Sequence, residues 1–185
     1  MSLGVPSEAL FSARAFTSED VAATLRERGW LGGAVDADSE PALRAWLRRA
    51  AELLGPRAAD RAALESLLAL IFSYDGRAIL QDAAHQAVLA REGARDVIRE
   101  LANRVLAGGD VDSDRLKEII DGMKAALPYR SREMFHPIRV ALAGRAGDGD
   151  LDRVILLLDE AASLPFAAPV KGTRQRMLEF CAALD

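Results

Sequence analysis

The chain has 185 residues, of which 50% are hydrophobic, 28% are charged and only 5% are aromatic. This composition is typical of a globular protein with an aliphatic core, and the length allows one domain or two small packed subdomains. The net charge of -4 argues against a protein that coats nucleic acid through its overall charge, although a local basic face remains open.

In the first half of the chain, apolar residues recur three and four positions apart, and glycine, proline or capping residues separate the runs. These signals predict a short helix after a cap at 17–20, a helix from Ser39-Glu40-Pro41 to Gly55-Pro56, and a helix around 64–71. Two further helices are expected over 77–91 and 94–107, with loops at 29–38 and 74–76.

In the second half, Gly108-Gly109 predicts a boundary between a first subdomain, 17–107, and a second, 110–185. Residues 1–16 are expected to be a lead-in, and its first residues are typical of an expression-vector remnant. Helices are predicted over 112–127, over 132–143 with Gly144 as terminator, around 151–158, and through 177–181 after an irregular link. No strand pattern is found, so the predicted fold is an all-α helical cage of about nine helices in two subdomains.

The sequence carries no pattern of a cofactor, metal or membrane protein. Cys181 is the single cysteine, and His85 and His136 are far apart without ligands at suitable spacing. Asp148, Asp150 and Asp152 lack the rest of a calcium loop, so we expect acids at the start of a helix instead. Without a leader or a run of about 18 apolar residues, a cytoplasmic protein with no membrane contact is expected.

One segment concentrates basic residues. Residues 128–145 contain Arg130, Arg132, Arg139 and Arg145 but one acid, Glu133. On a helix Arg132, His136 and Arg139 share one face, which is typical of a reader of phosphates and base edges. A solvated helix face is the alternative interpretation. The general preference for arginine over lysine is explained by a compositional bias as well as by contacts to phosphates and bases.

The same segment carries a resemblance. The segment from Met134 to Gly144, which reads Met-Phe-His-Pro-Ile-Arg-Val-Ala-Leu-Ala-Gly, is followed by Leu151 and then Leu156-Leu157-Leu158. It resembles the C-terminal anticodon-binding domain of bacterial glutamyl-tRNA synthetases. That family has a Phe-x-Pro-x-Arg-x-Ala-Leu-x-Gly segment there, then a short loop and a leucine-rich helix. Upstream, Leu53-Leu54-Gly55-Pro56-Arg57 is similar to the family's helix-ending Arg-Pro-Arg element, with Gly55 in place of the first arginine.

The resemblance implies a helical cage that grips the anticodon loop of a glutamate tRNA. It implies that Arg57 approaches the third anticodon base and that Arg139 is the family's arginine after proline. It also implies that Leu151 lies against an unstacked base, as recognition of single-stranded RNA requires. A planar guanidinium suits such contacts because it forks onto acceptors, although Arg57 is also placed to complement a helix C-terminus. The predicted RNA-binding set is Arg57, Arg132, Arg139, Arg145 and Leu151.

The sequence departs from a complete synthetase of this family in two ways. The His-x-Gly-His and Lys-x-Ser-Lys elements of a synthetase catalytic half are absent, so we expect either a fragment of a glutamate–tRNA ligase or a stand-alone paralogue. The loop Gly147-Asp148-Gly149-Asp150 replaces the family's Gly-Pro element, and 163–172 reads as an insertion. These departures are consistent with a helical module that kept the fold, lost tRNA binding and binds a protein partner.

Overall fold

A computed structural model describes residues 15–33 and 40–185, and these residues form helices and no strand. The all-α prediction is therefore confirmed for the part of the chain that the structure describes. The elements in chain order are α1 (Ser18–Glu27), α2 (Pro41–Leu54), the 3-10 helix η1 (Gly55–Arg57), α3 (Arg61–Phe72), α4 (Gly76–Gln81), α5 (Ala83–Leu89), α6 (Ala94–Ala107), α7 (Ser113–Ala126), α8 (Ser131–Ala143), α9 (Asp150–Ile155), α10 (Leu158–Ala162) and α11 (Thr173–Leu184).

Helix boundaries follow local capping chemistry where the sequence predicted it. Thr17 and Asp20 form a reciprocal capping box at the start of α1. Pro41 occupies the first turn of α2, where a missing N–H costs nothing, whereas Ser39 lies outside the described residues. Gly144 ends α8 with a positive φ of 77°, a conformation that glycine adopts without strain.

Two segments predicted as single helices are divided, and these predictions were wrong. Between α4 and α5, Asp82 is extended and its carboxylate accepts hydrogen bonds from the backbone N–H groups of Ala84 and His85. Between α9 and α10, the chain makes a turn at which the indole Nε1 of the buried Trp46 donates to the carbonyl oxygen of Leu157 (3.1 Å). At the first break the carboxylate of Asp82 caps the start of α5. At the second, the backbone N–H of Leu157 donates to the carbonyl of Val154 (3.1 Å) in a tighter turn, and the carbonyl of Leu157 accepts both from Trp46 and from the N–H of Ala161 (3.1 Å).

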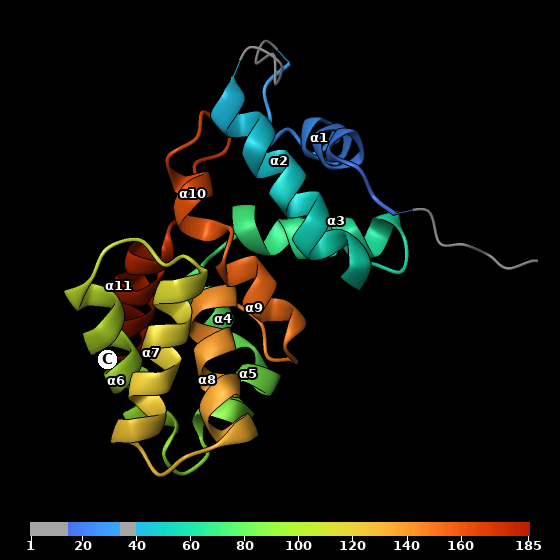
Figure 1. Cartoon of the computed structure of the whole chain (residues 1–185). Coiled ribbons are helices and arrows are strands. Elements are labelled where there is room, and N and C mark those ends of the chain that lie inside the picture. The colour runs from blue at the N-terminus through green and yellow to red at the C-terminus, as the bar shows by residue number, and fades with distance from the viewer. Residues whose placement is uncertain (1–14, 34–39) are drawn as a thin grey trace, which may run out of the picture.

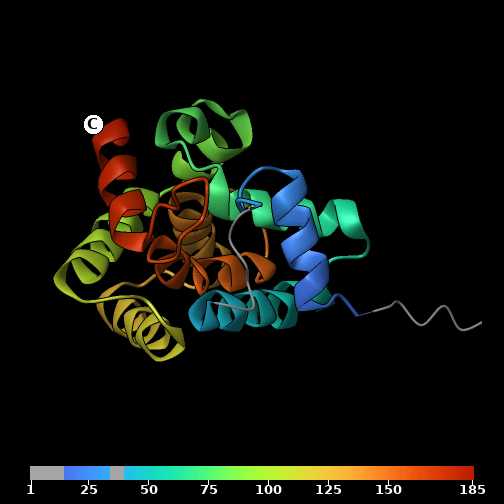
Figure 2. The ribbon, with the colours of Figure 1, turned by 90° about the horizontal axis from the view of Figure 1, so that it is seen from above.

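The helices form two packed groups joined by α9 and α10 (Figure 1). At one end α1 packs against α2 and α3, and at the other α11 packs against α4, α6 and α8. Helix α9 contacts α2, α3 and α8 and so lies at the junction. Seen from above, α1 and α11 lie on opposite sides with α8 and α9 between them (Figure 2). The division at Gly108-Gly109 stays a prediction; in the structure α6 packs against α7, α8 and α11.

A buried arginine ties the two groups together. The guanidinium of Arg176 in α11 is fully buried and donates to the carbonyls of Leu70 and Ile71 at the end of α3 and of Leu142 at the end of α8. It also lies over the ring of Tyr74, 4.5 Å from the centroid. Burial lowers the pKa of Arg176 to about 10, so the group stays charged at neutral pH. The cation complements two helix C-termini at once.

The segment 163–172 has a packing role. The Phe166 ring lies 5.0 Å from the rings of both Trp46 and Phe72, at near-perpendicular angles. The backbone N–H of Ala167 donates to the carbonyl of Trp30 (2.8 Å). The segment therefore covers an aromatic cluster contributed by the loop after α1, by α2 and by α3, and such edge-to-face pairs stabilise beyond the area they bury.

Candidate nucleic-acid interface

The structure gathers four of the five predicted RNA-binding residues near the turn from α8 into α9. Arg57 ends η1, Arg139 lies in the second half of α8, Arg145 follows Gly144, and Leu151 lies in the first turn of α9. A β-carbon at Gly144 would lie 3.1 Å from Ile79 and 3.4 Å from Tyr74, so the tight packing and the positive φ both favour glycine there. The sharp end of α8 is what turns the chain back toward Arg57.

Arg139 is buried and its hydrogen-bonding capacity is largely taken. Its Nε and Nη2 donate to the two carboxylate oxygens of Asp152 at 2.8 and 2.9 Å, and its Nη1 donates to the carbonyl of Gly147 at 3.1 Å. Its Cζ lies 5.1 Å from the centroid of the Phe135 ring. A bidentate pair held in this way fixes the shape of the turn, so Arg139 acts on the interface through the loop that it holds.

Arg57 is held much more loosely. Its guanidinium forms an ion pair with Asp150 at 3.3 Å, and the two side chains are 46% and 49% exposed. An exposed pair of this kind contributes little to stability because water and salt screen it. The chain neighbours of Arg57, but not Arg57 itself, line a groove of about 550 Å³ between the end of α2, η1 and the start of α1; its lining includes Phe16, Gly55 and Pro56.

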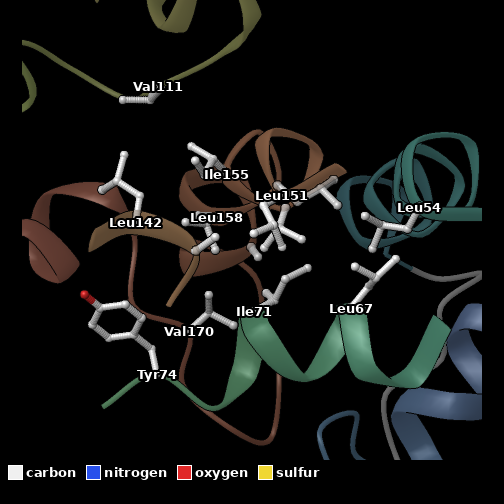
Figure 3. Close-up of a cluster of buried hydrophobic side chains, with 14 of the residues drawn as sticks. Leu54, Leu67, Ile71, Tyr74, Val111, Leu142, Leu151, Ile155, Leu158 and Val170 are labelled. Atoms are coloured by element: carbon white, nitrogen blue, oxygen red, sulfur yellow. The ribbon is translucent and has the colours of Figure 1, made fainter. Parts of the chain in front are cut away.

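Leu151 is a core residue in this conformation. Its side chain is 3% exposed and points into the cluster that contains Leu54, Leu67 and Ile155 (Figure 3). It has no free face on which a base could lie. The burial follows from the place of α9, which packs into the junction between α2, α3 and α8. The role that the resemblance implies for Leu151 stays a prediction, and a packing role is what the geometry supplies.

The other two predicted residues differ in exposure and place. Arg145 is partly exposed and its Nη1 donates to the hydroxyl of Ser66 in α3 (3.2 Å), which links the α8–α9 turn to the first helical group. Arg132 is exposed in the first turn of α8, the opposite end of that helix from Gly144. The interface residues predicted together are therefore split between the α8–α9 turn and the start of α8.

The aspartates at the start of α9 are the residues whose role sequence reasoning missed. They were expected as a helix N-terminal cluster, and Asp150 and Asp152 do lie in the first turn of α9. In the structure they also neutralise Arg57 and Arg139, one aspartate on each side of Leu151. The alternation of acids around one leucine was the available signal, but nothing in it identified the partner arginines.

The described residues contain no group of three or more histidine, cysteine, aspartate or glutamate side chains placed to hold a metal ion. His85 is buried, and its Nδ1 lies 2.8 Å from the carbonyl oxygen of Ile79. Cys181 is partly buried against the core. No helix in the described part of the chain has the length and apolar character needed to cross a lipid bilayer.

The fold and the site together define an all-α domain with three arginines gathered near the turn from α8 into α9. Sequence comparison identifies the family. The family model of the anticodon binding domain matches residues 13–164, and the chain belongs to this family. Glutamate–tRNA ligase 2 of Syntrophus aciditrophicus (strain SB) is 29% identical over 115 residues, which cover 62% of this chain and 23% of that protein. The match thus spans less than a quarter of that relative. No solved structure is significantly similar to the chain.

Proposed function

We propose that this protein binds the anticodon loop of a tRNA, and that the tRNA is a glutamate isoacceptor. Membership of the anticodon binding domain family supports the tRNA as partner, and the likeness to a glutamate–tRNA ligase supports the choice of isoacceptor. The observation that carries the proposal is the state of Arg57. Its side chain is half-exposed and restrained by one solvent-exposed ion pair, and its chain neighbours Pro56 and Ala58 line a groove of about 550 Å³.

Arg57 can exchange Asp150 for a group on the RNA at a small cost in free energy. An exposed ion pair contributes about 0.2–1 kcal/mol, whereas a guanidinium that forks onto a base edge or a phosphate gains two charge-assisted hydrogen bonds. The neighbouring groove has the size of a small-ligand site and includes the ring of Phe16, so it offers an apolar surface to a splayed base. Arg139 serves this site as a positioning residue, because it fixes the turn that carries Asp150.

In a glutamyl-tRNA synthetase, the catalytic half activates glutamate. Within this proposal the chain supplies recognition of tRNA, either as a fragment of a longer ligase or as a separate paralogue. The nucleotide-binding elements expected of a catalytic half do not occur in the 185 residues. Binding, not aminoacylation, is therefore the activity to measure on this chain.

The test is filter binding of glutamate tRNA and glutamine tRNA across a salt series, with wild type, Arg57→Ala and a matched control. Arg26→Ala is that control, because Arg26 is an exposed arginine on α1. We expect salt-dependent binding by wild type, weaker binding and a changed preference between the two tRNAs for Arg57→Ala, and no change for the control. Absence of salt-dependent binding by wild type would overturn the proposal.

The second candidate is a helical module that binds a protein. It is favoured by the balance of charges at the α8–α9 turn, where Asp148, Asp150 and Asp152 stand against Arg57, Arg139 and Arg145. A surface without excess positive charge attracts a polyanion weakly. Failure of the tRNA experiment would leave this candidate as the better interpretation.

A further inference from the structure

A group of basic side chains lies along α8, on the side of the molecule where α5 packs against it. Arg132 and His136 are one turn apart on α8, and Arg139 follows within the next turn on the same face. Arg91, from the turn between α5 and α6, reaches across, and its Nη1 lies 3.5 Å from the Nδ1 of His136. Two elements distant in sequence thus bring four basic groups together.

Two of these groups lack an acidic partner. Among the described residues, no carboxylate forms an ion pair with Arg91 or Arg132, whereas Arg139 is bound to Asp152. Asp96, Glu92 and Glu133 act on Tyr129, where burial and then their charges raise the pKa of the phenol. The hydroxyl of Tyr129 donates to Asp96 (3.3 Å). Arg91 and Arg132 therefore have no ion-pair partner among the described residues.

The pKa of His136 responds first to burial and then to the positive charges around it. Burial lowers its pKa below the usual value, and Arg91, Arg139 and Arg132 lower it further, while Asp148 alone acts in the opposite direction. At neutral pH the imidazole is therefore uncharged and its Nδ1 is available to accept from Arg91. An anion placed between these groups would reverse the balance, since it favours the protonated ring.

We propose that Arg91, Arg132 and His136 bind phosphates of the tRNA backbone, and that this track continues along α8 from the α8–α9 turn. The inference rests on the tRNA binding proposed above and adds a second contact region to it. From Arg132 to Arg139 the helix rises about 10 Å, at 1.5 Å for each residue, which is enough for more than one phosphate. Backbone contacts of this kind fix orientation and register without reading sequence.

A phosphate contact and a contact to a base edge have different effects on tRNA affinity. A phosphate contact weakens binding equally for all tRNAs and lowers the slope of log K against log salt by about 0.7–0.9. A contact that reads a base changes the preference between tRNAs instead. Arg91 and Arg132 are exposed, so their replacement by alanine leaves the core intact.

The test is the salt series of the preceding experiment extended to Arg91→Ala and Arg132→Ala, with Arg26→Ala again as control. Each variant is expected to weaken binding of glutamate and glutamine tRNA by the same factor and to lower the salt slope, whereas Arg57→Ala changes the ratio of the two affinities. If wild type binds but both variants keep its affinity and slope, the phosphate track is refuted and the proposed function stands. If wild type does not bind, both proposals fall.

His136 provides a second readout that a purely structural role would not move. Because a bound phosphate raises the pKa of the ring, binding takes up a proton, and wild-type affinity should increase as pH falls from about 7.5 to about 6. His136→Gln should remove this increase while keeping the wild-type unfolding midpoint. An unchanged pH dependence in the variant would exclude His136 from the track.

Discussion

Replacement of Asp150 by asparagine should strengthen tRNA binding. Asp150 holds Arg57 in an ion pair of 3.3 Å, and both side chains are about half exposed, at 46% and 49%. Binding through Arg57 first has to break this pair. Asparagine keeps the shape of the side chain and its place at the start of α9, and it removes only the charge.

The size of the effect follows from that exposure. A pair in this setting is worth about 0.2–1 kcal/mol, so removing the competition raises affinity by a factor of about 1.4 to 5. Loss of one negative charge facing an RNA backbone acts in the same direction, and more strongly at low salt. The unfolding midpoint should hardly move, because the pair contributes little to the folded state.

Asp152→Asn is the contrasting variant. Asp152 accepts two hydrogen bonds from the buried guanidinium of Arg139, at 2.8 and 2.9 Å. Hydrogen bonds to charged groups contribute about 1.5–3 kcal/mol, and the remaining arginine stays buried with an incomplete set of partners. This variant should therefore unfold at lower urea concentration, and its tRNA affinity should fall as the turn loosens.

A double-mutant cycle isolates the Arg57–Asp150 coupling. Affinities of wild type, Arg57→Ala, Asp150→Asn and the double variant are measured by filter binding at one salt concentration. The gain from Asp150→Asn should disappear in the Arg57→Ala background except for the general charge effect. An Asp150→Asn protein that binds tRNA more weakly than wild type, with an unchanged unfolding midpoint, would refute the reasoning.

Three further outcomes concern stability. Arg176→Met leaves the carbonyls of α3 and α8 without their donor and should lower the free energy of unfolding in urea by about 3 kcal/mol or more; a loss under 1 kcal/mol would contradict its role as the link between helix ends. Leu151→Ala should cost about 2–5 kcal/mol in the same assay, as expected for a buried leucine, and a neutral result would exclude its packing role. The pKa of Asp75 is lowered chiefly by the N–H of Ala78, and that of Asp82 by the N–H groups of His85 and Ala84. Folding thus favours both carboxylates ionised, so their contribution is present above the unfolded pKa of about 3.9 and is lost as pH falls through the folded pKa. Circular dichroism between pH 7 and pH 3 should show a smaller acid-induced loss of stability in the Asp75→Asn, Asp82→Asn protein.

The sequence by itself determined the class of the fold and most helix boundaries, because those depend on neighbours a few residues apart. The capping box of Thr17 and Asp20, the first-turn Pro41 and the terminator Gly144 all act within one helical turn. The segment from Met134 to Gly144 likewise carried the family resemblance, and the family is confirmed. Local signals of this kind survive without knowledge of how helices pack.

Sequence periodicity alone failed at two helix breaks. A helix pattern continues across 77–91 and 151–158, yet Asp82 caps a new helix within the first segment. In the second, the chain turns at Leu157, whose carbonyl also accepts from Trp46, more than a hundred positions away in the chain. Periodicity records which residues are apolar. It does not record which carbonyl a buried indole will reach.

Only the tertiary structure decided which of the predicted RNA-binding residues are free. Arg57, Arg139 and Leu151 come together around α9, but Asp152 and Gly147 engage Arg139 and the core encloses Leu151. Of these three, only Arg57 keeps a half-exposed, weakly held side chain, while Arg132 is exposed at the other end of α8. Burial and ion pairing depend on the partners that folding brings within a few ångströms. The way α9 packs against the core therefore decides which of the predicted residues are buried, which are paired and which are exposed.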